Sequence, residues 1–326
     1  MRTRRFSVHV FVFLLAALAV APLHALAADN TFDRTFTVSG PVRLELSNSS
    51  GNVDIRSGPD GQVKIHGKVS GNWSIWGNVE KNIQEAVSNP PVDQKGDTIR
   101  IGKETNWLKN ISIEYQIEVP HDTEIDAGIA SGGITVDKVR GPVKCSSASG
   151  YVHVYRVDGD ATVSAASGSI DVSSIGGVVH ASTASGSIAI ADVKGSVKAN
   201  AASGSIRVTR PGDRVEVSNV SGGVEVDSAN NDVRARVISG PINVRGNPSG
   251  NRLWDLKTVS GSVDIRVPKS AAFLLSAEAT SGDIRTGIPV VIEEQNKHSL
   301  RAHVGDSSGR VEVHTVSGSI NVNSGT

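Results

Sequence analysis

The sequence predicts an all-β fold: a parallel β-solenoid (β-helix) of about 18-residue coils made of two 9-residue units, with an N-terminal helix-containing cap. Two nested repeats and the composition support this prediction. Ser-Gly recurs every 18 residues, and inside each period a nine-residue pattern G-x-h-x-h-x-x-h-x repeats, where h is apolar. The chain also holds 34 Gly and only 4% aromatic residues, which is typical of β structure. The serines of the longer repeat are Ser131, Ser149, Ser167, Ser185, Ser203, Ser221 and Ser239.

Each nine-residue unit reads as a short strand followed by a bend. The first unit places Ile134 and Val136 two residues apart, on one face of a strand, and Val139 three residues later. No helical period near 3.6 is present in this block. Asp213 and Asn231 replace Gly at the start of two later units. Because Gly, Asn and Asp tolerate positive φ most easily, this column predicts turns with a left-handed backbone.

A sandwich or barrel of short strands is the structural alternative to a solenoid. The constant length of 12 consecutive units favours the solenoid, and so does an alternation of side-chain size. One unit carries bulky residues and the next carries small ones, as in Ile170/Val172/Ile175 followed by Val179/Ala181/Ala184. Large and small layers interdigitate across a thin core. Cys145, the only cysteine, falls in the small column and is predicted to be buried rather than reactive.

Charged residues recur in the outward columns of the repeat. Lys198, Glu216 and Arg234 alternate in sign in one column, and the pairs Arg207/Glu225 and Arg214/Asp232 follow the same rule. Coils about 4.8 Å apart bring such side chains within reach of each other. The alternative is that a solvated face carries mixed charge in any case.

Residues 1–28 read as a signal peptide. Arg2, Arg4 and Arg5 precede an apolar run over 11–20, and Ala25-Leu26-Ala27 offers a cleavage site. An uncleaved anchor is the weaker alternative, because that run is shorter than the roughly 20 residues of a membrane span. We therefore expect an exported protein, periplasmic or extracellular (cell surface), that is not an integral membrane protein after cleavage.

Residues 29–120 are predicted to form an N-terminal β region with a short capping helix. The helix is expected over 79–87, where apolar residues have helical spacing, and Asn89-Pro90-Pro91 ends it. Trp73, Trp76 and Trp107 are interpreted as part of this cap, with an aromatic platform for sugar rings as the alternative.

Residues 121–326 are predicted to form the regular solenoid with irregular C-terminal loops. Insertions over 246–254 and 267–275 should bulge out, and 293–303 interrupts the pattern again. The chain then ends on a strand unit without a visible cap. This C-terminal edge is therefore a candidate for self-association or for docking another protein.

No catalytic, cofactor-binding or metal site is predicted. Ser307 lies in a G-x-S-x-G segment, but only His314 follows it and no helix is expected there, so a Ser/Gly turn is favoured. A metal site at His298 and His303 with Glu293 and Glu294 is the less favoured reading of the irregular segment. Removal of the signal, which holds three Arg and no acid, leaves 30 basic and 33 acidic side chains. This net charge of −3 excludes the basic footprint of a nucleic-acid partner.

The segment ISIEYQIEVPHDTEIDAGIASGGITVDKV over 111–139, followed by serial ASG-x-[IV]-x-[VI], resembles a large putative-adhesin family of exported bacterial proteins with β-strand repeats. These carry a domain of unknown function and are similar to the auto-transporter adhesin head (GIN) domain. The resemblance covers roughly residues 33–322 and implies a β-solenoid outside the cytoplasm, with no catalytic residues to transfer.

Three functions are compatible with these observations. The favoured one is a non-catalytic binding or structural module of the cell envelope, adhesin-like, that contacts an envelope glycan or a protein along a flat face. The alternative is an envelope-stress or signalling component that acts through a protein partner at the C-terminal edge. A polysaccharide-active enzyme is disfavoured, because no column clusters carboxylates with Arg or Lys in the way such catalysis requires.

Overall fold

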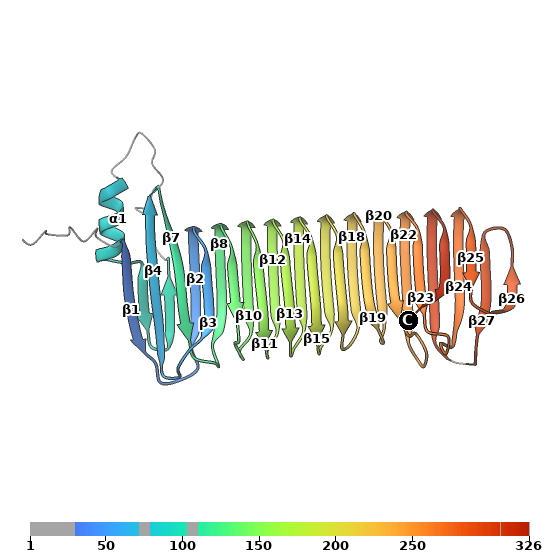
Figure 1. Ribbon diagram of the computed structural model, residues 1–326, viewed down its shortest axis with the longest axis horizontal. Coiled ribbons are helices and arrows are strands. Elements are labelled where there is room, and N and C mark those ends of the chain that lie inside the picture. The colour runs from blue at the N-terminus through green and yellow to red at the C-terminus, as the bar shows by residue number, and fades with distance from the viewer. Residues whose placement is uncertain (1–29, 72–78, 103–109, 307, 326) are drawn as a thin grey trace, which may run out of the picture.

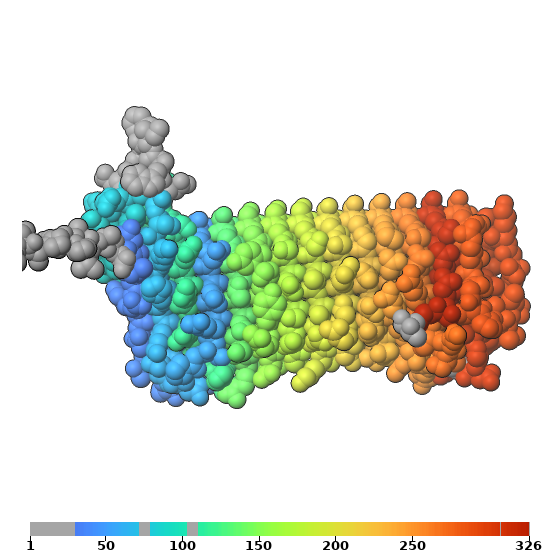
Figure 2. Space-filling view, viewed as in Figure 1, coloured from blue at the N-terminus to red at the C-terminus, as the bar shows by residue number. Residues whose placement is uncertain are grey.

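The computed structural model describes residues 30–71, 79–102, 110–306 and 308–325. They form an elongated, flattened solenoid of two β-sheets that face each other across a single core (Figures 1 and 2). Successive strands of the chain alternate between the sheets through the regular part, and neighbours within each sheet are parallel. The all-β prediction is therefore correct, and long parallel strand stacks dominate the molecule.

Sheet A contains 14 strands of the described residues. In spatial order they are β1 (Thr31–Thr37), β4 (Gln62–Gly71), β7 (Ile111–Val119), β3 (Val53–Ser57), β9 (Ile134–Asp137), β11 (Val152–Val157), β13 (Ile170–Ile175), β15 (Ile188–Val193), β17 (Ile206–Pro211), β19 (Val224–Ala229), β21 (Ile242–Gly246), β23 (Val263–Val267), β29 (Ile320–Ser324) and β25 (Ile284–Gly287).

Sheet B contains 15 strands over the same described ranges. From the C-terminal end they are β26 (Val291–Gln295), β27 (Ser299–Val304), β24 (Phe273–Ser281), β28 (Arg310–Ser317), β22 (Leu253–Ser260), β20 (Val233–Ser239), β18 (Val215–Ser221), β16 (Val197–Ser203), β14 (Val179–Ser185), β12 (Ala161–Ser167), β10 (Val143–Ser149), β8 (Glu124–Ser131), β2 (Arg43–Ser50), β6 (Thr98–Ile101) and β5 (Val92–Lys95).

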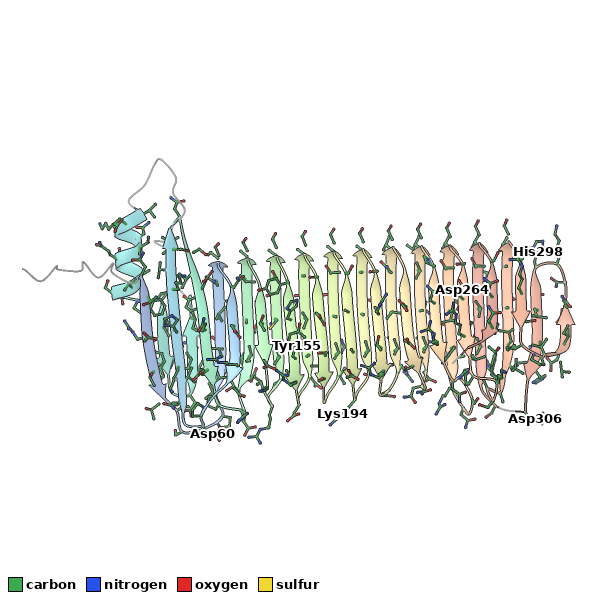
Figure 3. The ribbon with its side chains drawn as sticks, viewed as in Figure 1. Asp60, Tyr155, Lys194, Asp264, His298 and Asp306 are labelled. Carbon is green, nitrogen blue, oxygen red and sulfur yellow. The ribbon has the colours of Figure 1, made fainter. Side chains whose placement is uncertain are left out.

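Two long edges join the sheets. The Ser-Gly turns lead from sheet B to sheet A, and the turns that contain Lys194 and its equivalents lead back, along the lower edge of Figure 3. Gly150 shows why the Ser-Gly edge requires glycine. Its φ is 135°, and a Cβ there would lie 1.9 Å from the carbonyl oxygen of Gly132 on the preceding coil. The coils therefore stack more closely at this edge than any side chain permits.

Among the glycines that begin the nine-residue units, positive φ is confined to one of the two turn columns. The glycines that follow the repeated serines have positive φ, whereas Gly141, Gly159, Gly177 and Gly195 are not among the positive-φ residues. Asp213 and Asn231 belong to this second column. The prediction of left-handed turns from these two residues was therefore wrong, because neither Asp213 nor Asn231 has a positive φ.

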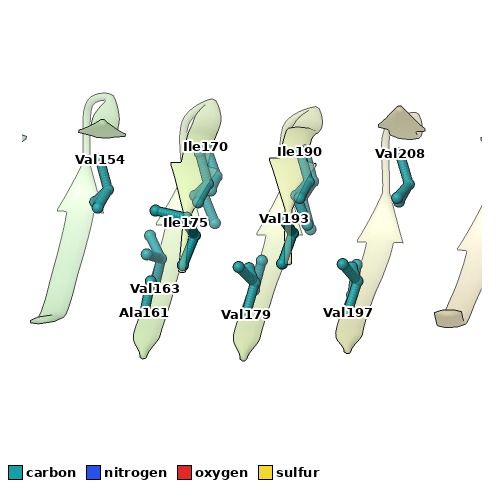
Figure 4. Close-up of a cluster of buried hydrophobic side chains, with 14 of the residues drawn as sticks. Val154, Ala161, Val163, Ile170, Ile175, Val179, Ile190, Val193, Val197 and Val208 are labelled. Carbon is teal, nitrogen blue, oxygen red and sulfur yellow. The ribbon is translucent and has the colours of Figure 1, made fainter. Parts of the chain in front are cut away.

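The core is a thin layer between the sheets, filled by large side chains from sheet A and small ones from sheet B (Figure 4). Ile170 and Ile175 of β13 are buried, and so are Val179 and Ala181 of β14. In sheet B, Cys145 is paired in register with Val163, which is paired with Ala181 in turn. Cys145 is buried, as predicted.

The third apolar position of the nine-residue unit behaves differently in the two sheets. In sheet A a single residue with positive φ, such as Arg156 (φ 52°), bends the strand and turns Val157 inward. Sheet B strands have no such bend, so their side chains continue to alternate between the core and the solvent along the whole strand. Thr183 consequently faces inward, and Ala184 faces solvent. The inward placement predicted for the third apolar residue of units such as Val179/Ala181/Ala184 was therefore wrong in sheet B, and Ala148 and Val316 at the equivalent positions also face solvent.

The N-terminal end carries a long insertion. β2 and β3 are followed in space by β8 and β9, and the strands β4, β5, β6 and β7 lie outside this first coil. The helix predicted over 79–87 is present as α1 (Val79–Ser88), and it packs mainly against β4. Ala86 is buried, and Ile83 packs against the core on the same helix face. Trp73, Trp76 and Trp107 lie outside the described residues.

The C-terminal end overturns one prediction. β28 and β29 do not form the edge, because β28 lies between β22 and β24, and β29 lies between β23 and β25. In Figure 2 this dark red end of the chain is a band between orange strands. After β25 the chain forms the antiparallel pair β26–β27 over the irregular segment and then returns to fill the gap. The uncapped C-terminal edge therefore does not exist in the predicted form; β25 and β26 are the outermost strands.

Within the described ranges, no helix combines the length and the apolar character that are needed to cross a membrane.

Candidate functional site

A row of three aromatic rings stands on the outer face of sheet A at β11. One of them, Tyr155, is labelled in Figure 3. Val152, Val154 and Val157 of this strand point into the core. The alternating residues Tyr151, His153 and Tyr155 therefore point outward on one line. The ring centroids lie 4.5 Å apart between Tyr151 and His153, and 5.7 Å apart between His153 and Tyr155. The three rings form a continuous aromatic surface across the strand.

Tyr151 lies flat against the neighbouring coil. A Cβ at Gly133 would lie 2.0 Å from Cζ of the Tyr151 ring, so the ring covers the bare backbone of Gly133. Tyr151 is the most exposed ring of the row, with 36% of its surface accessible. The absence of a side chain at Gly133 thus allows an exposed ring to rest on the sheet with its outer side open to a ligand.

Tyr155 is held by the next coil. Its hydroxyl donates a hydrogen bond to the Asp171 carboxylate, and burial of the ring followed by the charge and hydrogen bond of Asp171 raises the pKa of Tyr155. The adjacent Arg156 binds Asp137 through two hydrogen bonds of 2.8 and 2.6 Å. These contacts connect three successive strands, β9, β11 and β13, and fix the position of the aromatic row.

Such a row offers apolar faces bordered by hydrogen-bonding groups. Tyrosine combines a large apolar surface with a polar tip, and it loses little conformational entropy on binding. Flat rings of this kind stack on planar bases or on the apolar faces of sugar rings. The row therefore presents a flat surface on which ring-shaped groups of either kind can stack.

This row was not among the predicted sites, although the sequence contains a signal for it. Two of the three tyrosines in the chain fall at positions i and i+4 of one predicted strand, with His153 between them. The strand period of two places all three on a single outer face. The aromatic platform considered at Trp73, Trp76 and Trp107 lies outside the described residues and stays a prediction.

The histidines and acids of the irregular segment form an exposed ion-pair cluster. Glu293 accepts hydrogen bonds of 2.6 Å from Arg301 and from His303. The hydrogen bond from Arg301 is the largest cause that lowers the pKa of Glu293, followed by that from His303. His298 instead contacts the backbone oxygen of Ala279 at 3.1 Å. The two candidate histidine ligands, His298 and His303, thus make different contacts, and the Glu293 carboxylate is paired with Arg301.

The two remaining candidate residues are Cys145 and Ser307. Burial followed by the charge of Asp126 raises the pKa of the Cys145 thiol to about 12. Ser307 lies outside the described residues. Across 30–71, 79–102, 110–306 and 308–325, no group of three or more His, Cys, Asp or Glu side chains could hold a metal ion.

Two of the three predicted charge columns form ion pairs. Arg207 lies 2.8 Å from Glu225, and Arg214 lies 3.3 Å from Asp232. Glu216 and Arg234 are opposite each other in register, but Arg234 forms its ion pair with Asp255 on the other side, at 3.5 Å. These pairs are exposed, except for the Asp255 carboxylate, and contribute little stability individually.

No curated protein matches the chain. Among solved structures, a "putative cell adhesion protein" from Clostridium sporogenes is similar at 13% sequence identity, over 90% of this chain and 100% of that chain, with a TM-score of 0.21. The similarity to the GIN domain stays a prediction. The model of the Toastrack DUF4097 family matches residues 41–323, which is almost all of the described solenoid. The chain belongs to the Toastrack DUF4097 family.

Proposed function

We propose that this protein is a non-catalytic, exported, adhesin-like module of the cell envelope that binds a glycan through the outer face of sheet A. Residues 1–28 serve as its signal peptide, and coils of about 18 residues form its rigid body. One observation carries the proposal: the outward row of Tyr151, His153 and Tyr155 on a flat sheet. A flat, preformed surface suits an extended polymer, because it orders few side chains on binding.

The arrangement favours binding without turnover. The aromatic row is bordered by the paired Arg156 and Asp137, whose side chains neutralise each other. Asp171 is engaged by the Tyr155 hydroxyl. A glycosidase needs two carboxyl groups on opposite sides of the scissile bond, one of them protonated. The row instead provides surface for stacking.

Sedimentation of the purified protein with insoluble polysaccharides, including peptidoglycan and chitin, tests the proposal. We expect binding to at least one of them to weaken by about tenfold or more in Tyr151→Ala. Tyr155→Phe, which keeps the ring and loses the hydroxyl, should retain most of it. His180→Ala, on the outer face of sheet B, is the matched control. Equal binding by Tyr151→Ala and the native protein would refute the role of the row.

A further inference from the structure

A second surface lies on the outer face of sheet B. A groove of about 720 Å³ crosses β14, β16, β18, β20, β22 and β28 at right angles to the strands. One wall is apolar: Ala202, Val220, Ile238, Val259 and Val316. The other wall is polar: Ser182, Asn200, Ser218, Arg236, Lys257 and His314. Its volume is within the range of small-molecule sites.

The apolar wall is the column that the sequence repeat placed in the core. Because sheet B strands lack the left-handed bend, this column faces solvent. Exposure is 49% for Val220, 54% for Ile238, 49% for Val259 and 41% for Val316. Val316 continues the row only because β28 inserts beside β22. Four exposed β-branched side chains on adjacent strands form a contiguous apolar ridge, which is unusual on a protein surface.

The floor of the groove suits a ligand without hydrogen-bonding groups. Asn219, Val237 and Thr258 form the floor, and their backbones belong to strands with a parallel neighbour on each side. The sheet ladder therefore occupies the backbone donors and acceptors, so an extended peptide would gain no main-chain hydrogen bonds there. A hydrocarbon chain has no such groups to satisfy.

Positive charge flanks the apolar wall. Arg234 and Arg236 lie 3.5 Å from Oδ2 of Asp255, and Nζ of Lys257 lies 3.1 Å from Oδ1. Three cations thus share a single carboxylate whose side chain is only 9% exposed. Nearby Glu278 lies 3.5 Å from His314. Arg236 and Lys257, about half exposed, retain N–H groups for an anion at the rim of the groove.

We propose that this groove binds a free long-chain fatty acid, with its carboxylate at Arg236 and Lys257 and its chain along the apolar wall toward β14. Four strand intervals of about 4.8 Å separate β22 from β14, which is roughly 19 Å. An extended chain advances about 1.2 Å per backbone bond, and a hydrocarbon chain with similar bonds therefore needs about 16 carbons to fill this length. The apolar ridge is one residue wide and bordered by the exposed serines, such as Ser221 and Ser239, whereas a membrane-inserting surface needs a broad apolar face. The site is on the sheet opposite the aromatic row and does not depend on glycan binding.

Calorimetric titration with palmitate below its micelle concentration tests the site. We expect one palmitate per chain and a loss of affinity of at least about tenfold in Ile238→Asn. Val291→Asn, which changes an apolar side chain that is 72% exposed on β26, is the matched control and should bind normally. The double variant Val220→Thr with Val259→Thr keeps the β-branched shape of both side chains. Thr280 already occupies the equivalent exposed position on β24, so we expect this double variant to fold. This double variant should also bind more weakly.

The charge is tested separately. Arg236→Gln with Lys257→Gln should weaken palmitate but leave binding of methyl palmitate, which has no carboxylate, unchanged. Three results would overturn the proposal: no saturable binding of palmitate, equal losses in Ile238→Asn and Val291→Asn, or binding to anionic vesicles in place of the free acid.

Discussion

The neighbouring residues Gly222 and Gly223 offer a direct test of how closely the coils stack. Gly222 has a φ of 125°, and a Cβ there would lie 2.1 Å from the carbonyl oxygen of Gly204 on the preceding coil. A Cβ at Gly223 would lie 3.6 Å from the ring of Pro241, which is an ordinary contact, and Gly223 is not among the positive-φ residues. Gly222→Ala and Gly223→Ala therefore add the same methyl group to one turn, with opposite consequences.

The expected magnitudes follow from these contacts. A non-glycine residue held in this backbone region costs of order 1–3 kcal/mol. The clash also pushes away the Gly204 oxygen, which accepts a 2.7 Å hydrogen bond from Nδ2 of Asn219. Loss of that bond adds about 1 kcal/mol. We expect Gly222→Ala to lower the free energy of unfolding by about 2–4 kcal/mol. Gly223→Ala should change it by no more than about 0.5 kcal/mol.

Urea unfolding followed by far-ultraviolet circular dichroism measures the difference between the two variants. Because stacked repeats need not unfold in one step, native-state hydrogen exchange should accompany it. The amide of Val224, which donates a 2.9 Å hydrogen bond to the Pro241 carbonyl, reports on this turn. Its protection should fall in Gly222→Ala and persist in Gly223→Ala. Equal unfolding midpoints for the two variants would refute the stacking argument.

Three further predictions concern the core, the aromatic row and the chain end. Burial raises the pKa of the Cys145 thiol from 9.0 to about 12, so the unfolded chain loses this proton first as the pH rises. The contribution of the thiol to the free energy of unfolding is complete below pH 9. Between pH 9 and 12 the free energy of unfolding should fall by about 1.4 kcal/mol per pH unit. Comparison of native protein with Cys145→Ala across that range isolates the effect, and parallel pH profiles would contradict it. Asp171→Asn should lower the pKa of Tyr155 in an ultraviolet titration, while burial keeps it above its usual value; an unchanged titration would exclude the hydrogen bond. Removal of 310–326 should expose the strands of 273–304 to proteolysis, since β28 and β29 connect them to β22 and β23, and a truncated chain as resistant as the native one would contradict this strand order.

Much of the regular solenoid could be predicted from the sequence, because strand alternation is encoded by residues next to each other in the chain. The inward positions of Val143 and Cys145 follow from their spacing, and helix α1 follows from the apolar period over 79–87. The aromatic row is local in the same sense, since Tyr151 and Tyr155 share one strand. The sequence alone therefore contains enough information to predict this part of the candidate site.

The tertiary structure alone decided three features. The left-handed bends of sheet A occur at Lys138, Arg156, Ser174 and their equivalents, a column of mixed residue types without glycine. The repeat therefore did not reveal that sheet B lacks this bend and that Ala148 and Val316 face outward. The insertion of β28 between β22 and β24 depends on pairing between strands distant in sequence, which no local pattern encodes. The apolar groove results from both, because its wall combines outward side chains of consecutive coils with one from the last coil of the chain. Alternation within a strand is a local property of the sequence, whereas the bend between strands and the order of stacking are set by packing.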